Sequence, residues 1–125
     1  MSKTAAEMVA DANQAIEMVD VETAKSWLAN DDVVFLDVRD GAELAKGKIP
    51  GAVHISRGVL EFTVDPESAL HNPALASGKT ILVYCASGGR SALAGKTLLD
   101  MGVPRVANML GGIAAWKQAD GEIEL

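Results

Sequence analysis

Cys85 is the only cysteine in the chain, and the residues around it form a pattern that suits a reactive thiol. Residues 80–84 are apolar and rich in β-branched side chains, which predicts a buried strand that ends directly before the sulfur. Residues 91–101 have the pattern of an amphipathic helix. The loop between them consists of Ala86, Ser87, Gly88, Gly89 and Arg90. Backbone N–H groups in such a loop bind anions, and a helix N-terminus beside Arg90 favours thiolate over thiol, so a lowered pKa is predicted for Cys85.

The other polar residues have structural explanations. His54 and His71 lie in different expected elements without the spacing of metal ligands, so no metal site is predicted. Asp37 and Arg39 leave an expected strand, where polar side chains usually hold the next loop in place. A structural role is therefore expected for both rather than a catalytic one. No glycine-rich dinucleotide motif follows an expected strand, and no organic cofactor is predicted.

Composition limits the classes of function. The length of 125 residues predicts one domain over 1–125, and 49% hydrophobic with 22% charged residues is ordinary for a soluble globular chain. A net charge of −6 argues against a nucleic-acid partner. No apolar run approaches the roughly 20 residues that span a bilayer, and the polar N-terminus does not resemble a signal peptide. A lone cysteine cannot form an internal disulfide, so a reducing compartment and a cytoplasmic location are expected.

Expected strands alternate with expected helices along the chain. The strands are 16–19, 33–38, 52–55, 80–84 and 105–109. The helices are 3–15, 20–28, a short one opened by Asp40 and Glu43 as a capping pair, a turn at 57–62, 91–101 and 113–118. Residues 63–79 are expected to have little regular structure. This order predicts an α/β fold with a small, mainly parallel five-stranded sheet and helices on both faces. Ligands bind at the carboxyl ends of such strands, where Cys85 lies.

Apolar spacing also predicts which side chains are buried. Helix 3–15 should bury one face, helix 20–28 should bury three residues, and both tryptophans and the methionines should belong to the core. The expected face of the first helix consists of Ala5, Met8, Val9, Ala12 and Ile16. The three residues of the second are Ala24, Trp27 and Leu28.

Four blocks of the sequence, in this order, resemble the single-domain rhodanese-like sulfurtransferase family over about residues 18–116. The blocks are 36–40 with Glu43, 47–52, 85–91, and 108–112 with Trp116. In that family the active loop begins with cysteine, has glycine in fourth place and often has arginine in sixth, which are Cys85, Gly88 and Arg90 here. The resemblance implies a rhodanese-like fold.

The resemblance also implies a chemistry. Cys85 would be the catalytic thiolate that takes a sulfane sulfur from a donor such as thiosulfate and passes it, through a persulfide, to cyanide or a thiol. The N–H groups of the loop would bind the substrate and the persulfide anion. The candidate substrate-binding residues are Ala86, Ser87, Gly88, Gly89 and Arg90. The implied partners are the small donor and acceptor, with a sulfur-relay protein as a further candidate, and neither nucleic acid nor a membrane.

Two positions depart from the family pattern. The second loop position is often basic in the family and is Ala86 here, so a cation that would attract an anionic donor is missing. Lys48 stands where many relatives have histidine. Lys48 and Arg57 are the two candidates to supply the missing charge.

Two other functions remain open. A related branch of the fold, the phosphatases and arsenate reductases, binds a tetrahedral oxyanion in a Cys…Arg loop that is one residue longer. The shorter loop between Cys85 and Arg90 should fit one sulfur atom better than a phosphoryl group. The second alternative is a non-catalytic sulfur-carrier or interaction module; rhodanese-like interaction modules usually lose the cysteine, which this chain keeps.

Overall fold

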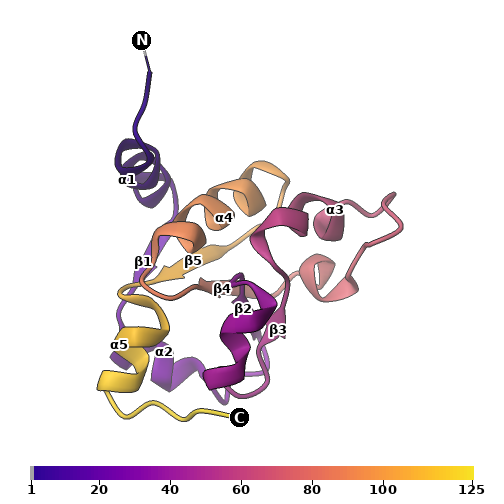
Figure 1. Ribbon diagram of the computed structural model, residues 1–125. Coiled ribbons are helices and arrows are strands. Elements are labelled where there is room, and N and C mark those ends of the chain that lie inside the picture. Colours follow the sequence, from indigo (N-terminus) through magenta and orange to yellow (C-terminus); the bar gives the residue numbers. More distant parts are fainter. Residues whose placement is uncertain (1) are drawn as a thin grey trace.

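Five parallel strands form one sheet in the order β1-β5-β4-β2-β3 in the computed structural model, which describes residues 2–125 (Figure 1). The strands are β1 (Glu17–Val19), β2 (Val33–Asp37), β3 (Val53–His54), β4 (Thr80–Tyr84) and β5 (Val106–Met109). The register pairs Asp37 with Tyr84 and Val83 with Asn108. The central strands therefore end at the same edge of the sheet, and Cys85 follows there directly after β4. The predicted five-stranded α/β sheet is confirmed.

Helices cover both faces of the sheet, as predicted (Figure 1). One face is covered by α3 (Leu60–Val64) and α4 (Gly89–Asp100), with α1 (Ala5–Ala15) packed against α4, and the other face is covered by α2 (Val21–Trp27) and α5 (Gly112–Gln118). Three short 3-10 helices are η1 (Gly41–Lys46), η2 (Arg57–Val59) and η3 (Pro73–Ala76). None of the helices in residues 2–125 is long and apolar enough to cross a membrane.

Strand β4 explains how the core is divided. Val83 and Cys85 point toward the layer of α3 and α4, whereas Leu82 and Tyr84 point toward Trp116 of α5. Side chains of a strand alternate between the two faces, and both faces of this sheet are covered. A strand that is buried on both sides needs a continuous apolar run, which is why residues 80–84 could be recognised from the sequence.

The first helix differs from its prediction in extent and in burial. It begins at Ala5 rather than at residue 3, because Thr4 is its N-cap and forms a capping box with Glu7. Within α1 only Ala12 is buried, and Met8 is 49% exposed. The helix packs against α4 and lies away from the sheet, so it has a narrow contact face rather than the wide one expected.

Several other boundaries and burials also need correction. Residues 63–79 contain the end of α3 and all of η3, and α4 begins at Gly89, two residues earlier than expected. Trp27 is only half-buried, although Trp116 is fully buried. Of the methionines, Met109 is buried, whereas Met8 and Met101 are exposed. Met1 lies outside the described residues.

Candidate active site

The Cys85 loop (residues 85–90) surrounds the sulfur with donors. The Gly88 N–H donates to Cys85 Sγ at 3.1 Å, and the Ser91 N–H donates at 3.4 Å. The Ser91 Oγ lies 3.4 Å from the same sulfur. Gly88 has a φ of +115°, a left-handed backbone that glycine adopts without steric penalty, and this conformation turns its N–H toward the sulfur. Cys85 is 1% exposed, so these donors replace water around it.

The surroundings of Cys85 have opposing effects on its pKa. Burial in the apolar layer raises the pKa of the thiol, because a thiolate is poorly solvated there. Hydrogen bonds that the thiolate accepts from the Ser91 hydroxyl and from the backbone N–H groups of Ser91, Gly88 and Ser87 lower it. The hydrogen bonds prevail, and the pKa of Cys85 lies below its ordinary value. This is the direction predicted from the sequence, and the N–H groups of the loop that the prediction invoked are among its causes.

The Arg90 side chain binds Glu43 of η1. The guanidinium donates two hydrogen bonds to the carboxylate, from Nη1 at 2.7 Å and from Nη2 at 2.9 Å. Such a two-point pair is directional and stronger than a single contact. Glu43 also accepts from the Asp40 N–H at 2.9 Å, so its predicted capping role is confirmed. Its second partner was not predicted, because nothing local links two residues so far apart in the chain.

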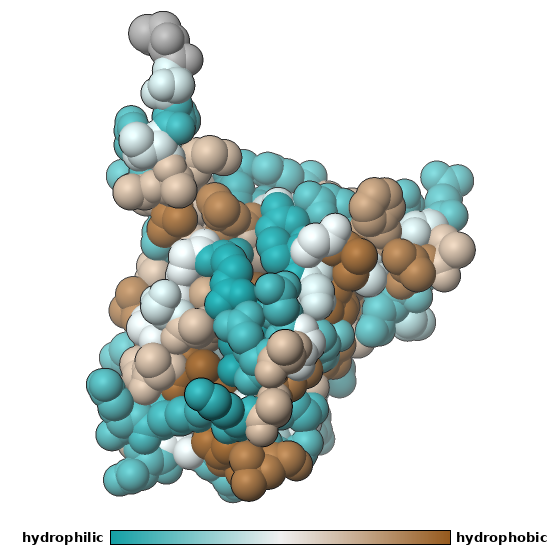
Figure 2. All heavy atoms as spheres, in the orientation of Figure 1, coloured by the Kyte–Doolittle hydropathy of each residue, from teal (hydrophilic) through white to brown (hydrophobic). Residues whose placement is uncertain are grey.

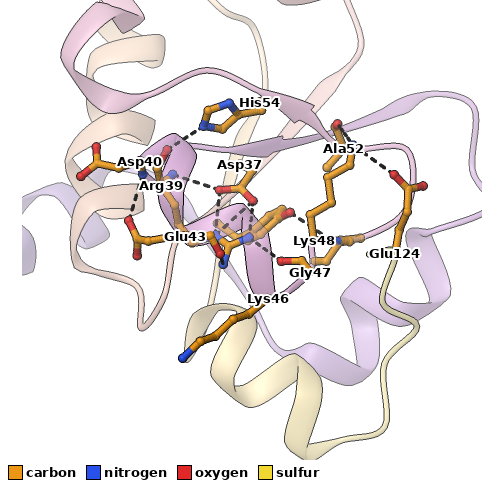
Figure 3. Close-up of polar contacts among 12 residues, drawn as sticks. Asp37, Arg39, Asp40, Glu43, Lys46, Gly47, Lys48, Ala52, His54 and Glu124 are labelled. Atoms are coloured by element: carbon orange, nitrogen blue, oxygen red, sulfur yellow. Dashed lines mark hydrogen bonds and ion pairs between the residues drawn. The ribbon is translucent and has the colours of Figure 1, made fainter.

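Asp37 and Arg39 support the segment that carries Glu43 (Figure 3). They form a buried ion pair with an Nη2–Oδ2 distance of 2.8 Å. Arg39 also donates to the carbonyls of Gly47 at 2.9 Å and of Glu43 at 3.3 Å, at the end and in the middle of η1. The expectation that these side chains hold the next loop in place is confirmed. Figure 2 shows hydrophilic residues gathered over η1 in the middle of the face in view.

The start of α5 supports the Cys85 loop from the opposite side. The Ile113 N–H donates to the Cys85 carbonyl at 2.9 Å, and the Ala114 N–H donates to the Ala86 carbonyl at 3.2 Å. Gly112 has a φ of +61°, and a Cβ at this position would lie 2.5 Å from the Ala86 carbonyl oxygen. Glycine is required at this position because the Cys85 loop lies against it.

A model of the rhodanese-like domain matches residues 20–119. The chain belongs to the rhodanese-like domain family. It is 31% identical over 102 residues to a sulfurtransferase of Allochromatium vinosum, covering 81% of this chain and 88% of that protein. It is 31% identical over 105 residues to a tRNA uridine(34) hydroxylase of Bordetella parapertussis, covering 82% of this chain but only 43% of the hydroxylase. This rhodanese-like domain therefore corresponds to less than half of the second protein.

A solved structure matches almost the whole chain. It is a protein of unknown function from Rhodopseudomonas palustris, described as a possible tyrosine phosphatase, with 41% identity and a TM-score of 0.95. The match covers 99% of this chain and 96% of that one. It therefore includes the N-terminal helix, which lies outside the residues that the family model matches.

Lys48 and Arg57, the two candidates to supply the charge that is missing at position 86 of this rhodanese-like domain, bind residues outside the Cys85 loop. Lys48 Nζ donates to the Ala52 carbonyl at 3.0 Å and lies 3.5 Å from Glu124 (Figure 3). Arg57 binds Glu61 at 3.1 Å and Thr97 at 3.2 Å. Within residues 2–125, neither forms a hydrogen bond with the Cys85 loop. The absence of a cation at position 86 is thus not compensated by a contact from either residue.

One hollow lies beside the Cys85 loop and another lies beside η1, which carries Glu43. One, of about 170 Å³, is bordered by Ser87, Gly88 and Gly89 of the loop and by Val9 and Asn13 of α1. The other, of about 390 Å³, is bordered by residues of η1, including Glu43 and Lys46, and by Lys117 of α5. In the described part of the chain, no three His, Cys, Asp or Glu side chains converge as metal ligands.

The Glu43–Arg90 pair predicts a pH dependence of stability. Hydrogen bonds from Arg90 and from the Asp40 backbone lower the pKa of Glu43 from 4.5 to about 2. The stabilisation is thus present above pH 4.5 and is lost as the pH falls toward 2. Glu43→Gln keeps a capping side chain but removes this titration, so its free energy of unfolding should fall less between about pH 5 and pH 3 than that of the wild type.

Urea denaturation at several pH values measures this difference. The effect should be modest, because the side chains of Arg90 and Glu43 are 39% and 34% exposed, and water screens the attraction between their charges. Parallel stability curves for the wild type and Glu43→Gln would show that the pair does not contribute.

Proposed function

We propose that this rhodanese-like domain is a sulfurtransferase in which Cys85 carries a sulfane sulfur as a persulfide. The observation that carries the proposal is the position of Cys85 Sγ, which accepts N–H hydrogen bonds from Gly88 and Ser91 at the turn between β4 and α4. Thiolate nucleophiles require this kind of stabilisation, and the same donors suit the anion of a persulfide. The similarity to the Allochromatium sulfurtransferase supports the same reaction class.

The reaction has two displacement steps. The Cys85 thiolate attacks the outer sulfur of a donor such as thiosulfate, the S–S bond of the donor breaks, and its electron pair leaves with sulfite. The terminal sulfur is then held on Cys85 as a persulfide anion. An acceptor nucleophile, cyanide or a thiolate, attacks that terminal sulfur. The Sγ–S bond breaks, and its electron pair restores the Cys85 thiolate.

The lack of a second cysteine fits this cycle. A neighbouring thiol would attack the persulfide and convert it to a disulfide. Cys85 is the only cysteine of the chain, so the sulfur can leave only to an external acceptor. A small thiol, cyanide or the thiol of a sulfur-relay protein is the acceptor class in this proposal.

The phosphatase alternative is less well supported. A Cys…Arg phosphatase loop uses the guanidinium to hold the phosphoryl oxygens, and here both terminal nitrogens of Arg90 are bound to Glu43. The loop also has one residue fewer than phosphatase loops. The description of the Rhodopseudomonas protein makes aryl phosphate hydrolysis a necessary comparison.

Mass spectrometry of the intact protein tests the proposal. After incubation with thiosulfate the protein should gain the mass of one sulfur atom, and cyanide should remove it with release of thiocyanate. Aryl phosphate hydrolysis should be negligible by comparison. Absence of the sulfur adduct with thiosulfate and with an organic persulfide, or Cys85-dependent hydrolysis at a comparable rate, would reject the sulfurtransferase assignment.

Ala86→Arg should lower the KM for thiosulfate. Ala86 is half-buried in the Cys85 loop, and a cation there would attract a dianion. In a partly water-excluded site this attraction is worth on the order of 1 kcal/mol, or about fivefold in KM. The gain should shrink as salt rises, because the attraction is electrostatic.

Steady-state kinetics at two ionic strengths check this result. A neutral organic persulfide serves as the matched donor, and its KM should change much less. An unchanged or higher KM for thiosulfate would mean that the N–H groups of the loop already provide the whole positive field for the donor.

A further inference from the structure

A chain of hydrogen-bonded polar side chains leads from Cys85 to the N-terminal helix. Ser91 Oγ lies 3.4 Å from the sulfur and 2.6 Å from Asn108 Oδ1. Asn108 Nδ2 lies 3.0 Å from Asn13 Oδ1 and 3.2 Å from the Gly88 carbonyl oxygen. Ser91 is fully buried and Asn108 is 1% exposed, so water does not replace these contacts. The chain joins β5, α4 and α1 at the Cys85 loop.

The direction of each hydrogen bond in this chain is fixed by chemistry. A carbonyl oxygen only accepts, so the group of Asn108 that faces the Gly88 carbonyl must be the amide nitrogen. The amide oxygen of Asn108 then faces Ser91, and it also only accepts. The Ser91 hydroxyl therefore donates its single hydrogen to Asn108 and presents a lone pair to Cys85.

This arrangement sets up a competition for one proton. When Cys85 is a neutral thiol, the Ser91 hydroxyl bonds to Asn108. When Cys85 is a thiolate or a persulfide anion, the same hydroxyl can donate to sulfur only by giving up Asn108. We propose that Asn108 is a positioning residue of this site, which holds the Ser91 hydroxyl proton away from the sulfur until an anion forms there, and that Asn13 of α1 fixes Asn108 in this orientation.

The role of Asn13 extends the site beyond the part of the chain that the family model matches. Asn13 lies before residue 20, where that match begins. Val9 of α1 borders the same hollow as Gly88 and Gly89 of the loop. The Asn13 hydrogen bond and this shared hollow place α1 beside the loop, so the helix is more than an addition to the outer surface.

The residues whose hydrogen bonds compete are uncharged, so substituting them leaves the charged groups around the Cys85 loop unchanged. The charged groups beside the Cys85 loop are Arg90 of α4, Glu43 of η1 and its N-cap Asp40, and the Asp37–Arg39 pair lies at the end of the neighbouring strand. The residues that α1, β5 and α5 bring against the loop do not titrate; they are Val9, Asn13, Asn108 and Gly112. Neutral substitutions of Ser91, Asn108 or Asn13 therefore test the hydrogen bonds alone.

The test measures the pKa of Cys85 from the ultraviolet absorbance of the thiolate, with Cys85→Ser as the baseline. Burial raises the pKa of Tyr84, the only tyrosine, so the ionisation of its phenol does not overlap with that of the Cys85 thiol. Asn108→Leu removes the competing acceptor and should lower the pKa of Cys85 by about half a pH unit to one pH unit. The Gly88 carbonyl keeps its hydrogen bond from the Ala92 N–H in this variant.

Ser91→Ala tests whether the effect passes through the hydroxyl. This variant should raise the pKa of Cys85, and adding Asn108→Leu to it should produce no further change. A loosened loop would lose N–H hydrogen bonds to the thiolate and raise the pKa, so the sign separates positioning from structural damage. A rise or no change in Asn108→Leu, or an equal fall in the Ser91→Ala background, would overturn the proposal.

Asn13→Ala provides a second route if Asn108→Leu does not fold. It should lower the pKa of Cys85 in the same direction by a smaller amount, and Gln14→Ala, an exposed neighbour on α1, is the matched control that should leave it unchanged. A rise in Asn13→Ala would overturn the proposal. The inference concerns the thiol of the proposed sulfurtransferase, but the titration uses no sulfur donor. A missing persulfide and a missing pKa change are therefore separate results.

Discussion

Cys85→Ser should abolish sulfur transfer while the protein remains folded. A serine hydroxyl is not ionised near neutral pH and is a far weaker nucleophile than a thiolate, so the rate should fall by at least roughly a thousandfold. The substitution is small, and the Gly88 N–H can donate to the new hydroxyl as it does to sulfur. Thiocyanate formation from thiosulfate and cyanide measures the activity, and circular dichroism with thermal unfolding measures the fold.

The two measurements together make the result decisive. A folded Cys85→Ser protein that gains no sulfur by mass spectrometry would support the persulfide mechanism. A folded variant that transfers sulfur at the wild-type rate would show that thiosulfate and cyanide react at another group, and the assignment of Cys85 would be wrong.

The parts of the site that were predictable are those encoded by neighbouring residues. Strand β4 is buried on both faces, so its apolar run is continuous and its end at Cys85 could be placed. Asp40 and Glu43 are three residues apart and form the expected capping pair. The lowered pKa of Cys85 also follows locally, because Gly88 and Ser91 are only three and six residues from Cys85 in the sequence.

The parts that were missed depend on residues distant in the sequence. Glu43 meets Arg90, and Asn13 meets Asn108, only because the parallel sheet brings their elements to one edge. No periodicity or capping signal encodes such a pair. The sequence predicts a helix from residue 91, whereas the structure includes Gly89 in the first turn of α4. Glycine has a low helix propensity, so nothing local marks that turn as helical.

Gly112→Ala should disrupt both stability and sulfur transfer. A Cβ at this position would lie 2.5 Å from the Ala86 carbonyl oxygen and 2.6 Å from that of Cys85. Both are backbone atoms, so no side chain can rotate away and the Cys85 loop itself must move. Backbone strain at φ +61° and the overlap together should cost about 3 kcal/mol or more in the free energy of unfolding. Urea denaturation and thiocyanate formation measure the two effects.

Gly51→Ala separates the overlap from the strain. Gly51 has a similar φ of +76°, but no atom lies within 4 Å of its hypothetical Cβ. This control should lose only the strain energy, about 1 kcal/mol, and should transfer sulfur at the wild-type rate. Gly112→Ala should lose activity even at temperatures where it is fully folded, because displacement of the Cys85 carbonyl moves the sulfur away from the Gly88 and Ser91 N–H groups. Equal behaviour of the two variants would mean that α5 does not hold the Cys85 loop in its active position.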